Sequence, residues 1–189
     1  TDIEGKYRSL YDYLSDEVSK VPPGANGVIF TPWLHGNRSP FEDSRAGAMF
    51  FNIRLENGKR DMLRAVLEGI CYHLRWLLEC EAKKVQTSDP IRFVGGGALS
   101  PLTCQVLADI TGRTIETIDN TQSVGAMGAA LTVAAGDRGV DVLELSCRLV
   151  KANHTYIPDP GNKEIYERNY QVFKRLYRGN AAAFRMLNS

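Results

Sequence analysis

The chain has 189 residues, which suits one domain and allows a sizeable hydrophobic core. Its 23 basic and 22 acidic residues are interspersed and leave a net charge of +1, which excludes the strongly basic face of a nucleic-acid-binding protein. No apolar run approaches the ~20 residues that cross a bilayer, and the first residues show neither an initiator Met nor a signal-peptide pattern. We therefore expect a cytoplasmic fragment of a longer protein that binds neither nucleic acid nor membranes.

The first part of the chain predicts a helix followed by two short strands. Residues 1–26 are expected to form a leading helix and linker, because apolar residues at helical spacing end at Pro22-Pro23-Gly24. Gly27–Phe30 predicts a short buried strand. A loop rich in proline and glycine then runs from Thr31 to Asp43, and Ala48–Ile53 predicts another strand.

Residues 61–81 form the strongest predicted helix. Its apolar residues recur at helical spacing, so we expect one continuous stripe to face the core: Met62, Val66, Ile70, Leu74 and Leu77, widened by Leu63, Leu67 and Cys71. Glu68 lies beside this stripe, and we expect it to accept a hydrogen bond from a backbone or side-chain donor rather than to take part in chemistry.

The second half of the chain alternates strands with helices. The predicted elements are strand 91–94, helix 101–110, strand 114–118, a small-residue helix 123–135, a weaker helix 140–149, a loop 151–160 and an amphipathic helix 163–186. Strands separated by such helices favour an α/β fold with a partly parallel sheet. We divide the chain into the leading segment 1–26, an α/β core 27–160 and a C-terminal helix 161–189. Gly128 predicts close packing of the small-residue helix, and Gly112 predicts the end of helix 101–110.

The stretch from Gly95 to Ser100, Gly-Gly-Gly-Ala-Leu-Ser, carries the most information about function. It joins a predicted strand to the helix that begins at Pro101. Glycines let the backbone turn sharply or approach a ligand, and a helix N-terminus presents free N–H groups, so the turn suits a phosphate or a ribose. No Gly-Lys-Ser/Thr follows, and Ser100 stands where the dinucleotide fingerprint needs Gly or Ala. A plain strand-to-helix connection remains the alternative.

With these elements in order, the chain resembles the C-terminal domain of the FGGY carbohydrate kinases from about Ile29 to Leu176. Four segments carry the resemblance: the loop Thr31–Pro40 with Asp43, the segment Ala48–Glu68 including Leu63–Gly69, the turn Gly95–Ser100 with Gln105 and Ala108–Gly112, and the small-residue helix Gly125–Ala130. Asn37 replaces the family's usual Glu, Asn52 replaces a usual Gly, and an acidic residue often found before the small-residue helix is absent.

The resemblance implies an α/β, actin-like ATPase and ribonuclease-H-like domain, the C-terminal half of a two-domain sugar kinase. Gly95, Gly96, Gly97 and Ala98 would approach ATP through the backbone, and Ser100 and Pro101 would line its base or ribose. Some members carry Asn at the position of Pro101. The partners implied are a small sugar, with a xylulose-like ketose the best match, and the N-terminal half of the same kinase; a homodimer is left open.

The resemblance places no catalytic residue in this chain. The family's general base is an Asp of the N-terminal half, and Mg²⁺ would be held mainly by that half and by the nucleotide phosphates. The isolated chain is therefore expected to be inactive, because phosphoryl transfer needs nucleophile, metal and phosphate positioned together. The alternative is a non-catalytic actin-like nucleotide-binding module that acts as a sensor, activator or scaffold.

The remaining candidates lie in the loop from Thr31 to Asp43. His35, Arg38 and Asp43 could touch substrate or the other half when the domains close. The structural alternatives are an exposed histidine and an Arg38–Asp43 ion pair that braces the loop. The cysteines (Cys71, Cys80, Cys104 and Cys147) show no C-x-x-C spacing, so we expect free thiols and no metal site.

Overall fold

The computed structural model describes residues 5–7 and 9–188. Thr1–Glu4 and Arg8 of the leading segment, and Ser189 of the C-terminal segment, lie outside the described residues. The helices and strands in chain order are α1 (Leu10–Ser19), β1 (Ile29–Thr31), β2 (Met49–Phe51), α2 (Lys59–Glu81), β3 (Ile91–Arg92), α3 (Pro101–Thr111), β4 (Ile115–Ile118), α4 (Val124–Arg138), α5 (Val142–Leu149), β5 (Ala152–Tyr156) and α6 (Lys163–Leu187). Within these ranges no helix has the length and apolarity that a membrane span requires.

The strands form two small sheets. β1 pairs with β2 antiparallel, with Ile29 opposite Phe51. The second sheet has the order β3-β4-β5, in which β3 and β4 are parallel and β4 and β5 are antiparallel. The mixture of parallel strands and helices confirms the expected α/β architecture, and Gly112 ends α3 with a positive φ of 66° as expected.

β5 corrects the expectation of a loop over residues 151–160. Ala152–Tyr156 pairs along β4, with Ile115 opposite Tyr156 and Glu116 opposite Thr155. Four of its five residues are exposed, so the strand has no alternation of apolar and polar residues that the sequence could display. Pairing with the edge of β4, and not burial of its own side chains, makes this segment a strand.

The buried face of α2 also differs from the expected stripe. Ile70 is 44% exposed, whereas Ala65, Glu68 and Tyr72 are each 1% exposed. Gly69 lies on the same buried face, directly against β1. Of the predicted residues, Cys71 is buried, whereas Met62, Val66 and Leu74 are only partly buried where they pack against the core.

An ion pair explains why charged residues occupy this buried face. Arg64 Nε donates to Glu68 Oε1 at 2.7 Å, and Arg64 Nη2 donates to the Tyr166 hydroxyl on α6 at 2.7 Å. The same Glu68 oxygen accepts from the Gly24 N–H at 2.9 Å and from Tyr166 at 3.2 Å. Glu68 thus joins α2, α6 and the linker before β1, which confirms its expected role as an acceptor for buried donors.

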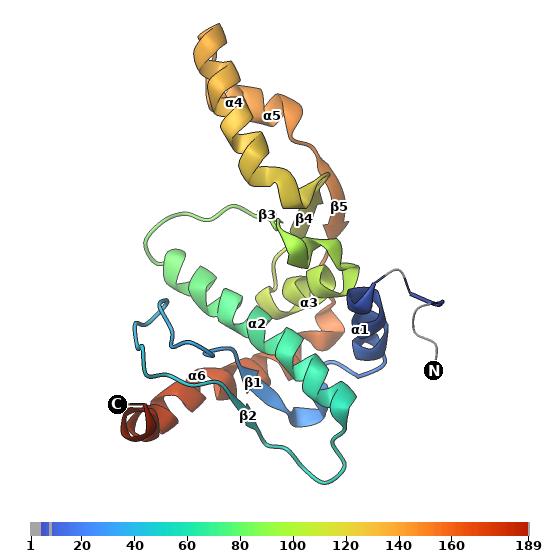
Figure 1. Ribbon diagram of the computed structural model, residues 1–189, viewed down its shortest axis with the longest axis vertical. Coiled ribbons are helices and arrows are strands. Elements are labelled where there is room, and N and C mark those ends of the chain that lie inside the picture. The colour runs from blue at the N-terminus through green and yellow to red at the C-terminus, as the bar shows by residue number, and fades with distance from the viewer. Residues whose placement is uncertain (1–4, 8, 189) are drawn as a thin grey trace.

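Aromatic side chains from three segments fill the main core. Trp33, 1% exposed, lies with its ring centroid 5.7 Å from those of Phe173 and Tyr177 on α6. Tyr72 on α2 packs 5.7 Å from Phe173 and 6.2 Å from Tyr170. Figure 1 shows α2 crossing the body of the molecule with α6 behind it and α3 above.

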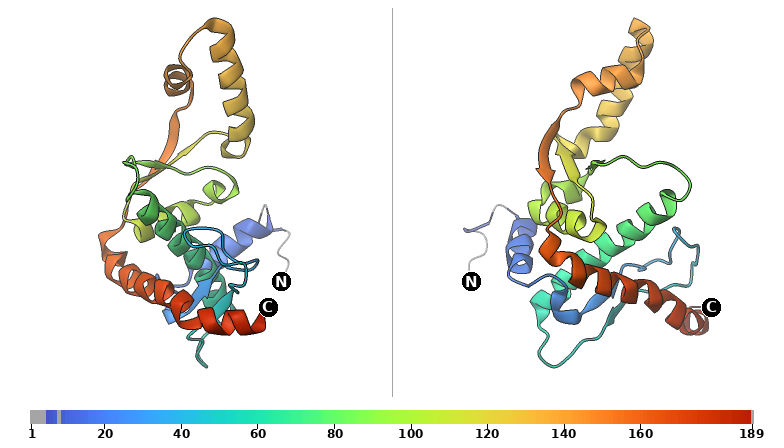
Figure 2. Two further views of the ribbon diagram at one scale, coloured as in Figure 1. Left: turned by 90° about the vertical axis from the view of Figure 1, so that its left-hand side faces the viewer. Right: turned by 180° about the vertical axis from the view of Figure 1, so that it is seen from behind.

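α4 and α5 project from this body as a helical hairpin (Figures 1 and 2). Ala135 is the single buried residue of α4. A Cβ built on Gly128 meets no heavy atom of the described residues within 4 Å. The expected close packing around Gly128 is therefore wrong for this structure, because the face of small residues is open to solvent.

Candidate functional site

The turn after β3 begins with a glycine whose backbone is held on both sides. Gly95 has a φ of 91°, a value that side chains other than glycine rarely adopt. Its N–H donates to the Thr121 carbonyl at 3.0 Å, and the Thr121 hydroxyl donates to the Gly95 carbonyl at 2.9 Å. Gly95 therefore anchors the turn. Its N–H and carbonyl groups are both bonded to Thr121 and are not available to a ligand.

The next two residues leave their N–H groups free. Gly96–Leu99 forms one turn of 3₁₀ helix, in which the Ala98 N–H donates to Gly95 and the Ser100 N–H donates to Gly97. The N–H groups of Gly96 and Gly97 have no acceptor among the described residues, and both glycines are exposed. Two adjacent N–H groups at the surface form the kind of backbone nest that binds an anion.

Packing within the protein also favours glycine at position 97. A Cβ at this position would lie 2.9 Å from Phe93 Cζ, which is closer than real Cβ contacts. Gly96 differs, because a Cβ there meets nothing within 4 Å. A side chain at position 96 consequently tests ligand access, whereas one at position 97 also disturbs the packing of Phe93.

Ser100 and Pro101 start α3. The Ser100 hydroxyl accepts from the Thr103 N–H at 3.3 Å, and Pro101 occupies the first helical position, where its missing N–H costs nothing. Ser100 Oγ also lies 3.4 Å from Ser15 Oγ of α1. The side chain of Ser100 is thus engaged in capping the helix and in contacting α1.

Ala98 is buried and supports the turn from below. It is 8% exposed, and its carbonyl accepts from Cys104 Sγ at 3.7 Å. Burial raises the pKa of the Cys104 thiol to about 11, so the thiol stays protonated and can donate. Ala98 therefore contributes backbone shape to the site, not a side chain.

The turn carries no charge of its own. No Asp, Glu, Lys or Arg occurs between Phe93 and Leu107. Attraction for an anion would come from the free N–H groups and from the N-terminus of α3, which carries a partial charge of about +0.5. Among residues 5–7 and 9–188, no group of three His, Cys, Asp or Glu side chains gathers to hold a metal ion.

A second segment borders this turn, and sequence reasoning did not identify it. The short turn Thr121–Ser123 follows β4 and leads into α4, and it lies against the turn Gly96–Leu99. Because β3 and β4 are parallel, their carboxyl ends share one edge of the sheet, where ligands commonly bind in α/β proteins. That rule could have singled out Thr121 from the sequence.

The structure gives the loop from Thr31 to Asp43 a different bracing pair from the expected one. Asn37 and Asp43 exchange two backbone hydrogen bonds of 2.9 Å. The Asp43 carboxylate accepts from the Tyr177 hydroxyl at 3.1 Å and lies 3.9 Å from Arg45. Burial, and then the Asp43 carboxylate, raise the pKa of Tyr177.

Arg38 has no ion pair within the described part of the chain, so the expected Arg38–Asp43 pair is wrong. The reason is that the Asn37–Asp43 ladder turns the Asp43 side chain toward α6, while Arg38 stays exposed. His35 is exposed as well. Figure 1 places this loop beside α2 and away from the turn Gly95–Ser100, so the structure does not bring these two sets of candidates together.

Comparison with known sequences identifies the chain's relatives. Residues 6–136 match the family model described as the FGGY family of carbohydrate kinases, C-terminal domain. The chain is 34% identical over 180 residues to xylulose kinase of Lactococcus lactis subsp. lactis. The aligned residues cover 94% of this chain and 36% of that protein. It is 33% identical over 157 residues to xylulose kinase of Staphylococcus epidermidis, covering 82% of this chain and 31% of that protein. The chain spans about a third of the length of these relatives.

Solved structures share the fold. A ligand-bound xylulose kinase from Lactobacillus acidophilus superposes with a TM-score of 0.82 and 27% identity, over 92% of this chain and 35% of that one. Gluconate kinase from the same species gives a TM-score of 0.83 and 27% identity, and the superposition covers 96% of this chain and 37% of that kinase. These likenesses place the actin-like fold of sugar kinases on nearly the whole chain.

Proposed function

This chain belongs to the FGGY family of carbohydrate kinases, and from that premise we propose that it is the nucleotide-binding, C-terminal domain of a longer kinase that phosphorylates a sugar hydroxyl. Kinases of this family are ATP-dependent phosphotransferases. Xylulose kinases among the relatives support a xylulose-like ketose as the sugar. The N-terminal half of the same kinase is the partner that completes the site, and the cytoplasm is its proposed location.

The pair of free N–H groups at Gly96 and Gly97 carries this proposal. Backbone N–H groups can hold phosphate oxygens of ATP without adding a charge, and the N-terminus of α3 favours the anion. ATP would supply the phosphoryl group. This chain would fix the nucleotide through Gly96 and Gly97, with Gly95 tied to Thr121 so that the turn keeps its shape.

The chemistry itself falls to groups outside this chain. The Mg²⁺ ion is proposed to be held mainly by the nucleotide phosphates and the N-terminal half. The general base is proposed to be an Asp of that half. The 189-residue chain alone is therefore expected to produce no sugar phosphate from ATP and xylulose.

The variant Gly96→Val in the longer kinase tests the site. Because a Cβ at position 96 meets nothing in the protein, the side chain should block the approach of the nucleotide without unfolding the turn. We expect the KM for ATP to rise about tenfold or more, which corresponds to about 1.4 kcal/mol. Gly179→Val, at an equally open position in α6, is the control and should leave the KM unchanged.

Three outcomes separate the alternatives. An unchanged KM for ATP in Gly96→Val would show that the nucleotide binds elsewhere. Binding of ATP by the longer protein without phosphorylation of any pentulose, hexulose, gluconate or glycerol would support a non-catalytic module. Phosphorylation of another sugar in preference to xylulose would overturn the substrate and leave the nucleotide site standing.

A further inference from the structure

A second concave surface lies between the C-terminal end of α2 and the middle of α6, away from the Gly95–Pro101 turn. It encloses about 310 Å³, a volume at the lower end of the range for small-molecule sites. The residues that the argument uses are Trp76, Glu79, Lys83, Lys174, Arg175 and Arg178. We call this surface the α2–α6 groove.

Positive charge is concentrated in the groove. Four Lys and Arg residues line it against a single carboxylate, that of Glu79. The whole chain, with 23 basic and 22 acidic residues, is close to neutral. The excess of cations is therefore a local feature and does not reflect a basic composition.

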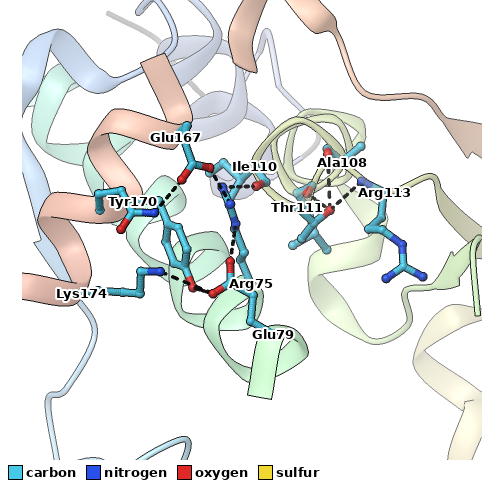
Figure 3. Close-up of polar contacts among 11 residues, drawn as sticks. Arg75, Glu79, Ala108, Ile110, Thr111, Arg113, Glu167, Tyr170 and Lys174 are labelled. Carbon is cyan, nitrogen blue, oxygen red and sulfur yellow. Dashed lines mark hydrogen bonds and ion pairs between the residues drawn. The ribbon is translucent and has the colours of Figure 1, made fainter. Parts of the chain in front are cut away.

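The one carboxylate in the groove is already occupied. Figure 3 shows Glu79 accepting a hydrogen bond of 2.7 Å from the Tyr170 hydroxyl and lying 3.2 Å from Arg75 Nε and 3.5 Å from Lys174 Nζ. Two cations thus offset its charge, and one of them, Lys174, belongs to the groove. An anion entering the groove would meet little repulsion from Glu79.

The other three cations are free. Lys83, Arg175 and Arg178 are exposed and make no hydrogen bond or ion pair with any described residue. Their donors are available to a ligand. Arg is well suited to this task, because its planar guanidinium group binds phosphate oxygens in a bidentate manner.

Stabilisation of a helix end explains only part of this arrangement. Lys83 follows the last residue of α2, Glu81, where a cation favourably offsets the helix dipole. Arg175 and Arg178 lie in the interior of α6, which spans Lys163–Leu187, and have no such role. Like charges four residues apart, as at Lys174 and Arg178, weaken a helix. A ligand that uses the charges gives a reason for their presence.

We propose that the α2–α6 groove binds the phosphate group of a small phosphorylated molecule through Lys83, Arg175 and Arg178. Trp76 supplies an apolar wall against which the organic part of such a ligand can lie. The inference does not depend on the nucleotide site, since none of these residues belongs to the Gly95–Pro101 turn.

Amide-resolved NMR titration of the 189-residue chain tests the proposal, with inorganic pyrophosphate and glucose 6-phosphate as separate probes and sodium chloride at matched ionic strength as the blank. We expect saturable shifts at the end of α2 and the middle of α6, with a dissociation constant of about 1 mM or tighter. Tighter binding of glucose 6-phosphate indicates a ligand with an organic part, and tighter binding of pyrophosphate indicates a polyphosphate.

A triple variant, Lys83→Gln with Arg175→Gln and Arg178→Gln, should weaken both probes by about tenfold or more. The matched control replaces three cations of the α4–α5 hairpin and the segment that follows it, Arg138→Gln, Arg148→Gln and Lys151→Gln, and should bind as the original chain does. Circular dichroism verifies that both variants fold. Absence of saturable shifts, equal affinity in the groove variant and the original chain, or shifts confined to Gly95–Thr103 would overturn the proposal.

Discussion

Gly69 of α2 approaches Phe30 of β1 so closely that a Cβ on Gly69 would lie 2.2 Å from the Phe30 carbonyl oxygen. The contact is made by backbone, which cannot rotate away as a side chain can. The Glu68–Arg64 pair, one residue away, ties the same turn of α2 to α6. Gly69 is therefore a point of close backbone contact between α2 and the β1–β2 sheet.

Gly69→Ala should destabilise the fold. The added methyl group must push α2 away from β1, and overpacking of this kind costs about 1–3 kcal/mol or more. Thermal and urea unfolding of the single variant measures the effect. An unchanged or higher stability would mean that α2 and β1 do not lie in direct contact.

Gly128→Ala should stabilise the fold, in contrast to Gly69→Ala. Nothing lies within 4 Å of a Cβ at this position of α4, and Ala is a better helix former than Gly by about 1 kcal/mol. We expect a small rise in stability of the 189-residue chain under the same unfolding conditions. A fall would show that the face of small residues is packed against something after all.

Tyr177→Phe and Arg38→Gln separate the real brace of the Thr31–Asp43 loop from the one that the sequence suggested. Removing the Tyr177 hydroxyl deletes its hydrogen bond to Asp43 and should cost about 1 kcal/mol of stability. Arg38→Gln should change stability by no more than about 0.5 kcal/mol, because Arg38 is an exposed residue without an ion pair among the described residues. The reverse order of the two effects, measured by urea unfolding, would contradict the assignment.

Glu17 should make stability depend on pH in the acid range. Hydrogen bonds from Arg60, and then from Lys20, lower the pKa of Glu17 to about 2 from its ordinary value of 4.5. A carboxyl whose folded-state pKa is depressed adds stability above its unfolded pKa, and that stability is lost as the pH falls from 4.5 toward 2.

Glu17→Gln tests this dependence. The variant should be less stable than the original chain near neutral pH. This difference in stability should vanish as the pH falls toward 2. Unfolding curves at a series of pH values give the comparison. A constant difference across the whole range would show that Glu17 acts through packing and not through its charge.

The sequence predicted the local features that depend on single residues with special backbone properties. Gly95 and Gly112 adopt the positive φ values that their positions require, and Pro101 starts α3. The turn of the candidate site could be located from these residues alone. Its second wall, Thr121, comes from strand pairing, which sequence periodicity does not report.

Long-range pairing also explains the errors. The buried face of α2 carries Arg64 and Glu68, so a stripe drawn through apolar residues alone misses residues that lie deepest in the core. β5 is a strand because β4 offers an edge, although its own side chains are exposed. The choice of Tyr177 as the partner of Asp43 depends on where α6 packs, 134 residues further along the chain.

The two hydrogen bonds between Gly95 and Thr121 have a consequence for motion. They join the turn after β3 to the segment that leads into α4, so the two cannot be displaced independently while both bonds hold. A change in the position of the turn is thus transmitted to the base of a hairpin that reaches far from the body, as Figure 1 shows. A small rotation at this base would displace the outer end of the hairpin more than the turn itself, because that end lies far from Gly95 (Figure 1).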